Sequence, residues 1–218
     1  MKHYVAPSLL AANKEKLGEE IKLVESLGAE YLHWDVMDGK FVPNTSYTTD
    51  DVRRFAKAHK MVNDVHIMVV DPEVEGPEFV AAGADLVTFH IEAVDFNKSK
   101  ILNIIDDLHK RDCKAGLSLK PNTKVEEVLP YLEHLDLILV MSVEPGLGGQ
   151  KFIPNALDKI KVLREYIDKH HLACLIEVDG GVNGETGKLC REAGADILVA
   201  GSYLFGHDDI AERIKLLK

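Results

Sequence analysis

Apolar, strand-like segments alternate with amphipathic, helix-like segments along the chain, and this alternation limits the possible folds more than any other feature. The strand-like segments are residues 5–10, 31–37, 65–70, 86–91, 115–119, 135–143, 175–178 and 197–200. The helix-like segments are residues 14–27, 49–57, 71 onward, 98–111, 125–131, 154–169, 185–192 and 208–217. A strand, a helix and another strand in succession build a parallel sheet.

Eight such units favour a closed (β/α)8 TIM barrel over an open, doubly wound sheet, because no dinucleotide-binding glycine fingerprint follows the first strand. A length of 218 residues suits one barrel with little chain left over. No linker divides the chain, so we expect a single α/β domain over residues 1–218. Three helix-to-strand turns, beginning at Gly28, Gly83 and Gly194, share the pattern glycine, alanine, acid, in which the acid caps the bottom of the strand.

Polar side chains gather at the strand ends where a barrel enzyme places its active site. The second strand carries His33 and Asp35 on one face, the third carries His66, and Asp179 follows the seventh. Two imidazoles and two carboxylates suit a borderline divalent cation: Zn²⁺ or Fe²⁺, with Mn²⁺ and Co²⁺ as alternatives. His90, at the end of the fourth strand, is either a fifth candidate ligand or a partner of one.

Three glycine-bearing turns complete the same end of the barrel. They contain Gly146, Leu147, Gly148 and Gly149 after the sixth strand, Gly180 and Gly181 after the seventh, and Gly201 and Ser202 after the eighth. Glycine lets backbone N–H groups approach an anion, and barrels often bind phosphate after strands 7 and 8. We therefore expect a barrel of the phosphate-binding type with the first turn as a lid, although plain turn chemistry is the simpler alternative. Met37, Met68 and Met141 either line this cavity or fill an irregular core.

The charge and the apolar runs exclude several classes of partner. A formal net charge of −10 argues against nucleic-acid binding, so a phosphate must be held locally by backbone N–H groups. No apolar run is long enough to span a bilayer, and residues 1–7 contain no signal segment. Cys113, Cys174 and Cys190 are widely spaced and odd in number, which indicates reduced packing residues in a cytoplasmic protein.

Several motifs at these positions resemble the signature of the ribulose-phosphate 3-epimerase family. The longest reads His33-Trp34-Asp35-Val36-Met37-Asp38-Gly39-Lys40-Phe41-Val42-Pro43-Asn44. The others are Pro7-Ser8-Leu9-Leu10, His66-Ile67-Met68, Met141-Ser142-Val143-Glu144-Pro145-Gly146, Glu177-Val178-Asp179-Gly180-Gly181 and Ala200-Gly201-Ser202. They stand in the family's order and spacing and cover nearly the whole chain.

The resemblance implies an isomerase of the pentose phosphate pathway that interconverts D-ribulose 5-phosphate and D-xylulose 5-phosphate. It implies abstraction of the C3 proton through an enediolate stabilised by one divalent metal ion. The residues that match the family's metal ligands are His33, Asp35, His66 and Asp179. Asp35 and Asp179 also match its acid/base pair, and Ser8 and His66 match residues that contact the sugar. The three glycine turns match substrate contacts made largely through the phosphate, and we expect a homo-oligomer, either a dimer or a hexamer.

The chain departs from the family at Trp34, at residues 45–51 and at Leu147, without losing a catalytic group. An alternative is an epimerase of a ketohexose 6-phosphate such as allulose 6-phosphate, whose turns tend to replace one glycine of the pairs that are intact here. A decarboxylase acting on a phosphorylated compound would need a strand-end lysine, for which Lys120 is the candidate. A non-catalytic sugar-phosphate sensor would not need both aspartates. The pentulose phosphate epimerase is therefore the preferred hypothesis.

Overall fold

The computed structural model describes residues 3–218, and its strands form one parallel sheet that curls into a barrel. The strands are β1 (Tyr4–Pro7), β2 (Tyr31–Met37), β3 (Val62–Met68), β4 (Leu86–His90), β5 (Lys114–Leu119), β6 (Leu137–Met141), β7 (Leu175–Asp179) and β8 (Ile197–Ala200). The hydrogen-bonded order is β1-β8-β7-β6-β5-β4-β3-β2. A single parallel bridge between Ser8 and His33 joins the two ends of this order. The prediction of a (β/α)8 barrel is confirmed.

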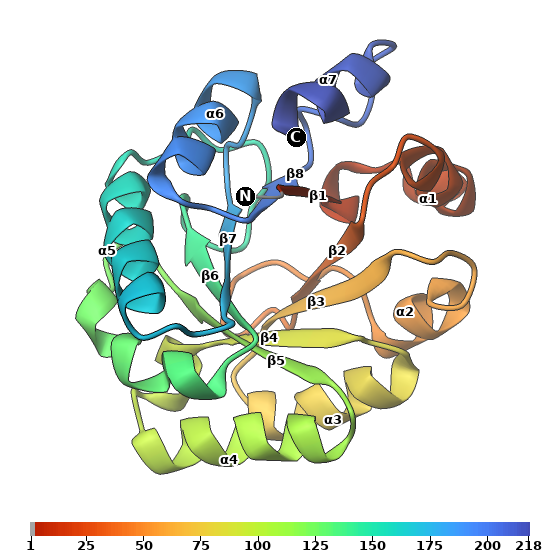
Figure 1. Cartoon of the computed structure of the whole chain (residues 1–218). Coiled ribbons are helices and arrows are strands. Elements are labelled where there is room, and N and C mark those ends of the chain that lie inside the picture. The colour runs from red at the N-terminus through yellow and green to blue at the C-terminus, as the bar shows by residue number, and fades with distance from the viewer. Residues whose placement is uncertain (1–2) are drawn as a thin grey trace.

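Helices surround the strands on the outside of the barrel (Figure 1). The α-helices are α1 (Leu17–Ser26), α2 (Thr49–Phe55), α3 (Pro72–Ala82), α4 (Lys98–Lys110), α5 (Asn155–Lys169), α6 (Gly184–Ala193) and α7 (Ile210–Leu217). Short 3-10 helices are η1 (Leu9–Ala11), η2 (Lys14–Lys16), η3 (Ile91–Val94), η4 (Val125–Glu127) and η5 (Leu129–His134). None of the helices built from residues 3–218 has the length and apolar character needed to cross a membrane.

Three of the differences between predicted and observed elements bear on the barrel. The first strand ends at Pro7, and η1 follows where the strand was expected to continue to residue 10. The helix expected at residues 125–131 is replaced by η4 and η5, because Pro130 has no N–H group with which to continue an α-helix. The third strand begins at Val62 instead of residue 65, which adds Asp64 to the face that points into the barrel.

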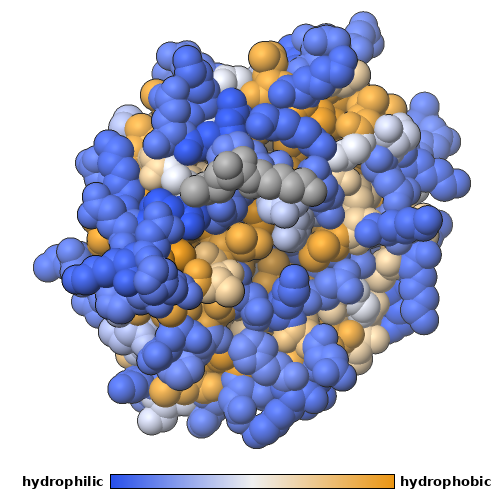
Figure 2. Space-filling view, in the orientation of Figure 1, coloured by the Kyte–Doolittle hydropathy of each residue, from blue (hydrophilic) through white to orange (hydrophobic). Residues whose placement is uncertain are grey.

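The strand residues that face the helices form the largest apolar core. On β2 these are Leu32, Trp34 and Val36, all buried in one cluster with side chains of the surrounding helices. A second buried cluster, which includes Tyr31, Leu86, Leu137 and Ile197, comes from the side of the strands that faces the barrel axis. On the surface, hydrophilic side chains gather over the outer helices, with apolar groups exposed between them (Figure 2). The alternation along each strand therefore separates an apolar outer layer from the barrel interior.

Carboxylates at the bottom of the barrel bind alternate strands. Each precedes an even-numbered strand and accepts a hydrogen bond from the second residue of the preceding odd-numbered strand. The pairs are Glu30 with Val5 N (3.2 Å), Asp85 with Asn63 N (2.7 Å), Asp136 with Ala115 N (2.9 Å) and Asp196 with Ile176 N (2.8 Å). The acid of the glycine-alanine-acid turn thus caps the neighbouring strand and not its own. Asp136 caps its neighbouring strand in the same way, although no glycine-alanine pair precedes it.

Candidate active site

Strand β2 carries two of the predicted ligands into the barrel because its side chains alternate between two environments. His33 and Asp35 point to the interior, while Trp34 between them packs outward against Tyr47 with the two rings perpendicular and 5.2 Å apart. In the β2–β3 pairing, Asp35 is the register partner of His66. Parallel pairing therefore brings these two side chains to the same level of the barrel.

The four predicted metal ligands converge at this level. Asp35 Oδ1 lies 3.6 Å from His33 Nε2 and 3.7 Å from His66 Nδ1. Asp179 Oδ2 lies 4.0 Å from the same His33 atom and 3.9 Å from the same His66 atom. These four atoms all lie within 4.8 Å of one another. His33 Nε2 and His66 Nδ1 are buried without a hydrogen-bond partner, which is what a shared cation would supply. The donor set therefore fits a divalent metal.

Two further acids lie buried directly below these ligands. Asp64 Oδ2 is 2.5 Å from His33 Nδ1, and Glu177 Oε1 is 3.9 Å from the same nitrogen. Burial lowers the pKa of His33, but Asp64 and Asp35 outweigh burial and hold that pKa well above its ordinary value. Burial and the charge of Asp64 raise the pKa of Glu177 well above its usual range.

The two aspartates that face the cation site differ in protonation. Burial raises the pKa of Asp35, but the charge of His33 and the nearby ring nitrogens of His33 and His66, 3.6 Å and 3.7 Å away, outweigh burial and hold that pKa well below its ordinary value. Burial and the charge of Asp35 raise the pKa of Asp179 to about 7. Ser8 Oγ donates to Asp35 Oδ2 at 2.6 Å, which fixes the orientation of that carboxylate. Asp35 is thus a carboxylate, whereas Asp179 can gain or lose a proton near neutral pH.

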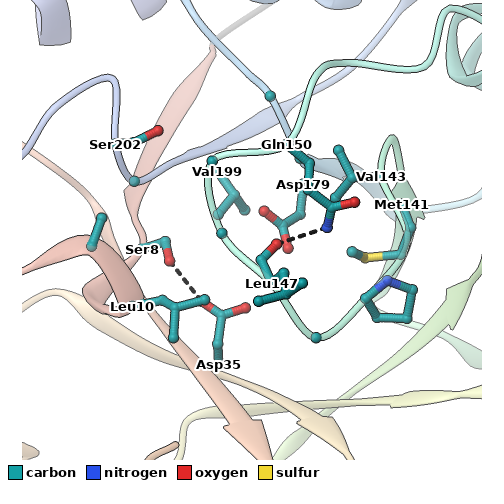
Figure 3. A pocket seen from close by; sticks show the side chains of 18 of the residues that line it. Ser8, Leu10, Asp35, Met141, Val143, Leu147, Gln150, Asp179, Val199 and Ser202 are labelled. Atoms are coloured by element: carbon teal, nitrogen blue, oxygen red, sulfur yellow. Dashed lines mark hydrogen bonds between the residues drawn. The ribbon is translucent and has the colours of Figure 1, made fainter. Parts of the chain in front are cut away.

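A cavity of about 350 Å³ opens above this cluster. Its lining includes most of the predicted substrate contacts: Ser8, Asp179, Gly146, Leu147, Gly148, Gly149, Gly180, Gly181, Gly201 and Ser202. His66 is not in the lining and lies beneath Asp35 and Asp179. Figure 3 shows Ser8 and Asp35 on one side of the cavity, Asp179 opposite, and Leu147 on the loop between them. Met37, Met68 and Met141 belong to the wall, which favours the cavity-lining alternative.

The lid (residues 144–152) is held by polar side chains at both ends. Asn44 Nδ2 donates to Gly146 O at 2.7 Å, and Gln150 Nε2 donates to Glu144 O and Leu147 O. Gly181 has a φ of +63°, and a Cβ there would press against the backbone of Gln150 and Phe152. The glycine after β7 is therefore needed for the lid to pack on the β7–α6 turn.

Three buried side chains lie next to the predicted ligands, and the sequence analysis either did not predict them or left their role open. His90 contributes a hydrogen bond to His66, with their Nε2 atoms 2.8 Å apart, so it is a partner of a ligand and not a fifth donor. Asp64 was missed because the third strand was expected to begin one residue after it. Its signal was the alternation of Asp64, His66 and Met68. Glu177, two residues before Asp179, carries the same signal on β7.

Comparison with known proteins identifies the family. The model of the ribulose-phosphate 3-epimerase family matches residues 4–205. The chain belongs to this epimerase family. A "Ribulose-phosphate 3-epimerase" of Mycobacterium bovis is 42% identical over 214 residues, covering 98% of this chain and 91% of that protein. A "Ribulose-5-phosphate-3-epimerase, chloroplastic" of Arabidopsis thaliana is also 42% identical over 214 residues, covering 98% of this chain and 75% of that protein. The predicted family is confirmed.

Solved structures share the barrel fold with this epimerase family member at low sequence identity. A 3-hexulose-6-phosphate synthase has a TM-score of 0.70 at 20% identity, covering 100% of this chain and 98% of that chain. A 3-keto-L-gulonate-6-phosphate decarboxylase of Vibrio cholerae has a TM-score of 0.73 at 14% identity, covering 100% and 96%. At these identities the likeness is one of fold.

Of the departures from the family pattern, Trp34 and Tyr47 lie outside the cavity lining and Leu147 is part of it. Trp34 and Tyr47, which replace family residues in two separate stretches, pack on each other, and Tyr47 Oη donates to Leu9 O at 2.7 Å. Leu147 is 62% exposed at the lid. Lys120, the candidate lysine of a decarboxylase, holds its ammonium group 4.2 Å from the ring centre of Phe41 and does not line the cavity.

Proposed function

We propose that this protein is a metal-dependent epimerase that interconverts D-ribulose 5-phosphate and D-xylulose 5-phosphate at C3. The observation that carries the proposal is the pair Asp35 and Asp179, which both face one cation site and whose pKa values are pushed apart, that of Asp35 downwards and that of Asp179 up to about 7. Inversion at a carbon needs a base on one face and an acid on the other. Membership of the epimerase family and the names of its curated relatives support the same substrate pair.

His33, Asp35, His66 and Asp179 would hold one divalent cation, Zn²⁺ or Fe²⁺, with Mn²⁺ and Co²⁺ as alternatives. When bound, it would act as a Lewis acid that offsets negative charge developing on the substrate oxygens next to C3. Asp64 supports the set through Nδ1 of His33. Because its neighbours raise the pKa of His33, a cation bound at Nε2 would compete with a proton there.

The ionised Asp35 would take the C3 proton, and the electron pair of the broken C–H bond would move towards the C2 carbonyl oxygen. Asp179 would then give its proton to the opposite face of C3, and the electron pair would return to form the new C–H bond. In the reverse direction the two aspartates exchange roles. Ser8 would contact the sugar, and Met37, Met68 and Met141 would keep water from the reacting carbon. His66, the other predicted sugar contact, lies outside the cavity lining and would act through the cation.

The substrate phosphate would lie on backbone amides of Gly180, Gly181, Gly201 and Ser202, under the lid that contains Gly146, Leu147, Gly148 and Gly149. Gly201 O accepts from Leu204 N and Phe205 N, so the chain makes a helical turn after β8. The first N–H groups of such a turn have no partner within it and suit an anion. Local amides are needed because the net charge of the chain is −10.

Asp35→Asn and Asp179→Asn test the acid/base pair, because the amide oxygen can still ligate a cation while proton transfer is lost. With metal content checked, each variant should lose about 10²–10⁴-fold in rate. Exchange of the C3 proton with solvent deuterium should persist from one epimer and fail from the other, in opposite senses for the two variants. Near-normal turnover in either metal-loaded variant would exclude that aspartate. Parallel assays on allulose 6-phosphate measure the ketohexose alternative.

The proposal extends to the organisation and location of the protein. We propose that the chain is a single domain, since one sheet contains strands from Tyr4 to Ala200 of the described residues 3–218. All three cysteines are buried and free, which supports a reducing compartment such as the cytoplasm. We also predict that the protein is a homo-oligomer, either a dimer or a hexamer. Light scattering after size-exclusion chromatography measures the oligomeric state.

A further inference from the structure

A relay of three hydrogen-bonded side chains, Glu92, His90 and His66, runs from the partly buried Glu92 to the predicted ligand His66. His66 and His90 are fully buried, and their Nε2 atoms lie 2.8 Å apart. The other ring nitrogen of His90, Nδ1, lies 3.2 Å from Glu92 Oε2. The other ring nitrogen of His66, Nδ1, has no hydrogen-bond partner and faces Asp35 and Asp179.

We propose that Glu92, acting through His90, selects the tautomer of His66 whose Nδ1 lone pair points into the cation site. Glu92 and His90 are positioning residues, because neither touches a reacting atom. The inference rests on the metal site of the proposed function, but the tautomer itself is a property of the chain without metal.

At the Glu92 end of the relay, the direction of the hydrogen bonds is fixed: the carboxylate accepts and does not donate. Glu92 Oε1 accepts from the backbone N–H of Lys120 at 2.7 Å and from Thr123 Oγ1 at 2.5 Å. A backbone N–H only donates, so this oxygen must be an acceptor. Burial raises the pKa of Glu92, but the hydrogen bonds and charge of His90 and the N–H of Lys120 lower it to about 2. Both carboxylate oxygens therefore accept.

The polarity passes from one ring to the next. Because Glu92 only accepts, Nδ1 of His90 carries the proton of their hydrogen bond. One proton lies between the two Nε2 atoms. If His90 donated it, His66 would carry its own proton on Nδ1, where it has no acceptor, so Nε2 of His90 is the acceptor. His66 must then donate from Nε2. Nδ1 of His66 has no hydrogen-bond acceptor, so it is left without a proton.

The opposite tautomers of His90 and His66 are disfavoured, each by the surroundings of its Nδ1 atom. A bare Nδ1 of His90 would face the Glu92 carboxylate, lone pair against lone pair. A proton on Nδ1 of His66 would be buried without an acceptor, since Asp35 Oδ1 at 3.7 Å and Asp179 Oδ2 at 3.9 Å lie beyond hydrogen-bond distance. That proton would also take up the Nδ1 lone pair through which His66 would bind a cation. His33 differs, because Asp64 accepts from it directly.

Ring-nitrogen chemical shifts of ¹⁵N-histidine in the metal-free wild-type protein give the first test. Protonated and unprotonated imidazole nitrogens resonate far apart. We expect His66 to be protonated at Nε2 alone and His90 at Nδ1 alone. A proton on Nδ1 of His66 in the wild-type protein would overturn the proposal without any variant having to fold.

Glu92→Gln gives the second test, because it keeps the shape and reverses the polarity. The amide oxygen must stay on the backbone N–H of Lys120, so the amide N–H₂ turns towards His90. His90 then accepts at Nδ1 and donates from Nε2, and His66 is left with its proton on Nδ1. Thr123→Val is the matched control, since it removes a hydrogen bond from the same Glu92 oxygen without reversing the polarity.

Metal affinity is the second readout, measured by competition between the protein and a chelator for Zn²⁺. Loss of such a supporting partner typically costs about 10–100-fold in metal affinity, and we expect that loss for Glu92→Gln and less than about 3-fold for Thr123→Val. An unchanged His66 tautomer or unchanged Zn²⁺ affinity in Glu92→Gln would refute the relay, even if the enzyme is an epimerase. Conversely, the predicted tautomers in a protein that does not epimerise pentulose phosphates would support the relay and reject the proposed function.

Discussion

Replacing Gly181 with alanine would drive a methyl group into the backbone of the lid. The added Cβ would lie closest to Phe152 N, 2.8 Å from Gln150 O and 2.9 Å from Phe152 Cα. Backbone atoms cannot rotate away as a side chain can, so the lid would have to retreat by about 0.6 Å or more to restore ordinary contact with Gln150 O. Gly149→Ala is the matched control, because Gly149 also has a positive φ, of +72°, and nothing lies within 4 Å of its added Cβ.

Both variants strain the backbone, but only Gly181→Ala also overpacks the lid. A left-handed backbone costs alanine about 1–2 kcal/mol, and both variants should lose about this much stability. Overpacking adds about 1–3 kcal/mol at Gly181 alone. The expected losses are therefore about 2–5 kcal/mol for Gly181→Ala and about 1–2 kcal/mol for Gly149→Ala.

Urea unfolding of both variants measures the difference, and limited proteolysis within residues 144–152 reports whether the lid has moved. Gly181→Ala should be cleaved faster in the lid than Gly149→Ala. Equal losses of stability together with equal cleavage rates would show that the contact between the β7–α6 turn and the lid does not hold the lid in place.

Two other predictions concern Glu92 and the lid. The folded-state pKa of Glu92 is depressed from 4.5 to about 2, so its ionisation stabilises the fold above the unfolded pKa, and that stability is lost as the pH falls. The difference in unfolding free energy between wild type and Glu92→Gln should shrink by about 1 kcal/mol per pH unit below pH 4.5, and a pH-independent difference from pH 6 to pH 3 would contradict this. Asn44→Ala removes the hydrogen bond to Gly146 O, worth about 0.5–1.5 kcal/mol, so affinity for a phosphorylated substrate analogue, measured by calorimetry, should fall about 2–10-fold. Unchanged affinity would mean that this bond does not help to hold the lid over the ligand.

Local pattern made the barrel and the set of candidate ligands predictable. Alternation along β2 put His33 and Asp35 on one face before any contact was known, and strand ends in a barrel meet at one mouth. Prediction failed at two places where the local pattern was misleading or incomplete. Residues 125–131 have an apolar helical pattern, but Pro130 has no N–H group to continue an α-helix. The start of β3 is set by its pairing with β2, which the sequence of β3 alone does not show.

The sequence by itself determined the eight-unit barrel, the family and the residues that can reach the barrel mouth, because periodicity and motif order are properties of the chain. Only the tertiary structure decided how these groups act on one another. The approach of Asp64 to His33, the chain from Glu92 to His66 and the contrast between Asp35 and Asp179 all join different strands or loops. Burial and short distance together set the pKa of a group and the polarity of a hydrogen bond, and both arise only when the barrel closes.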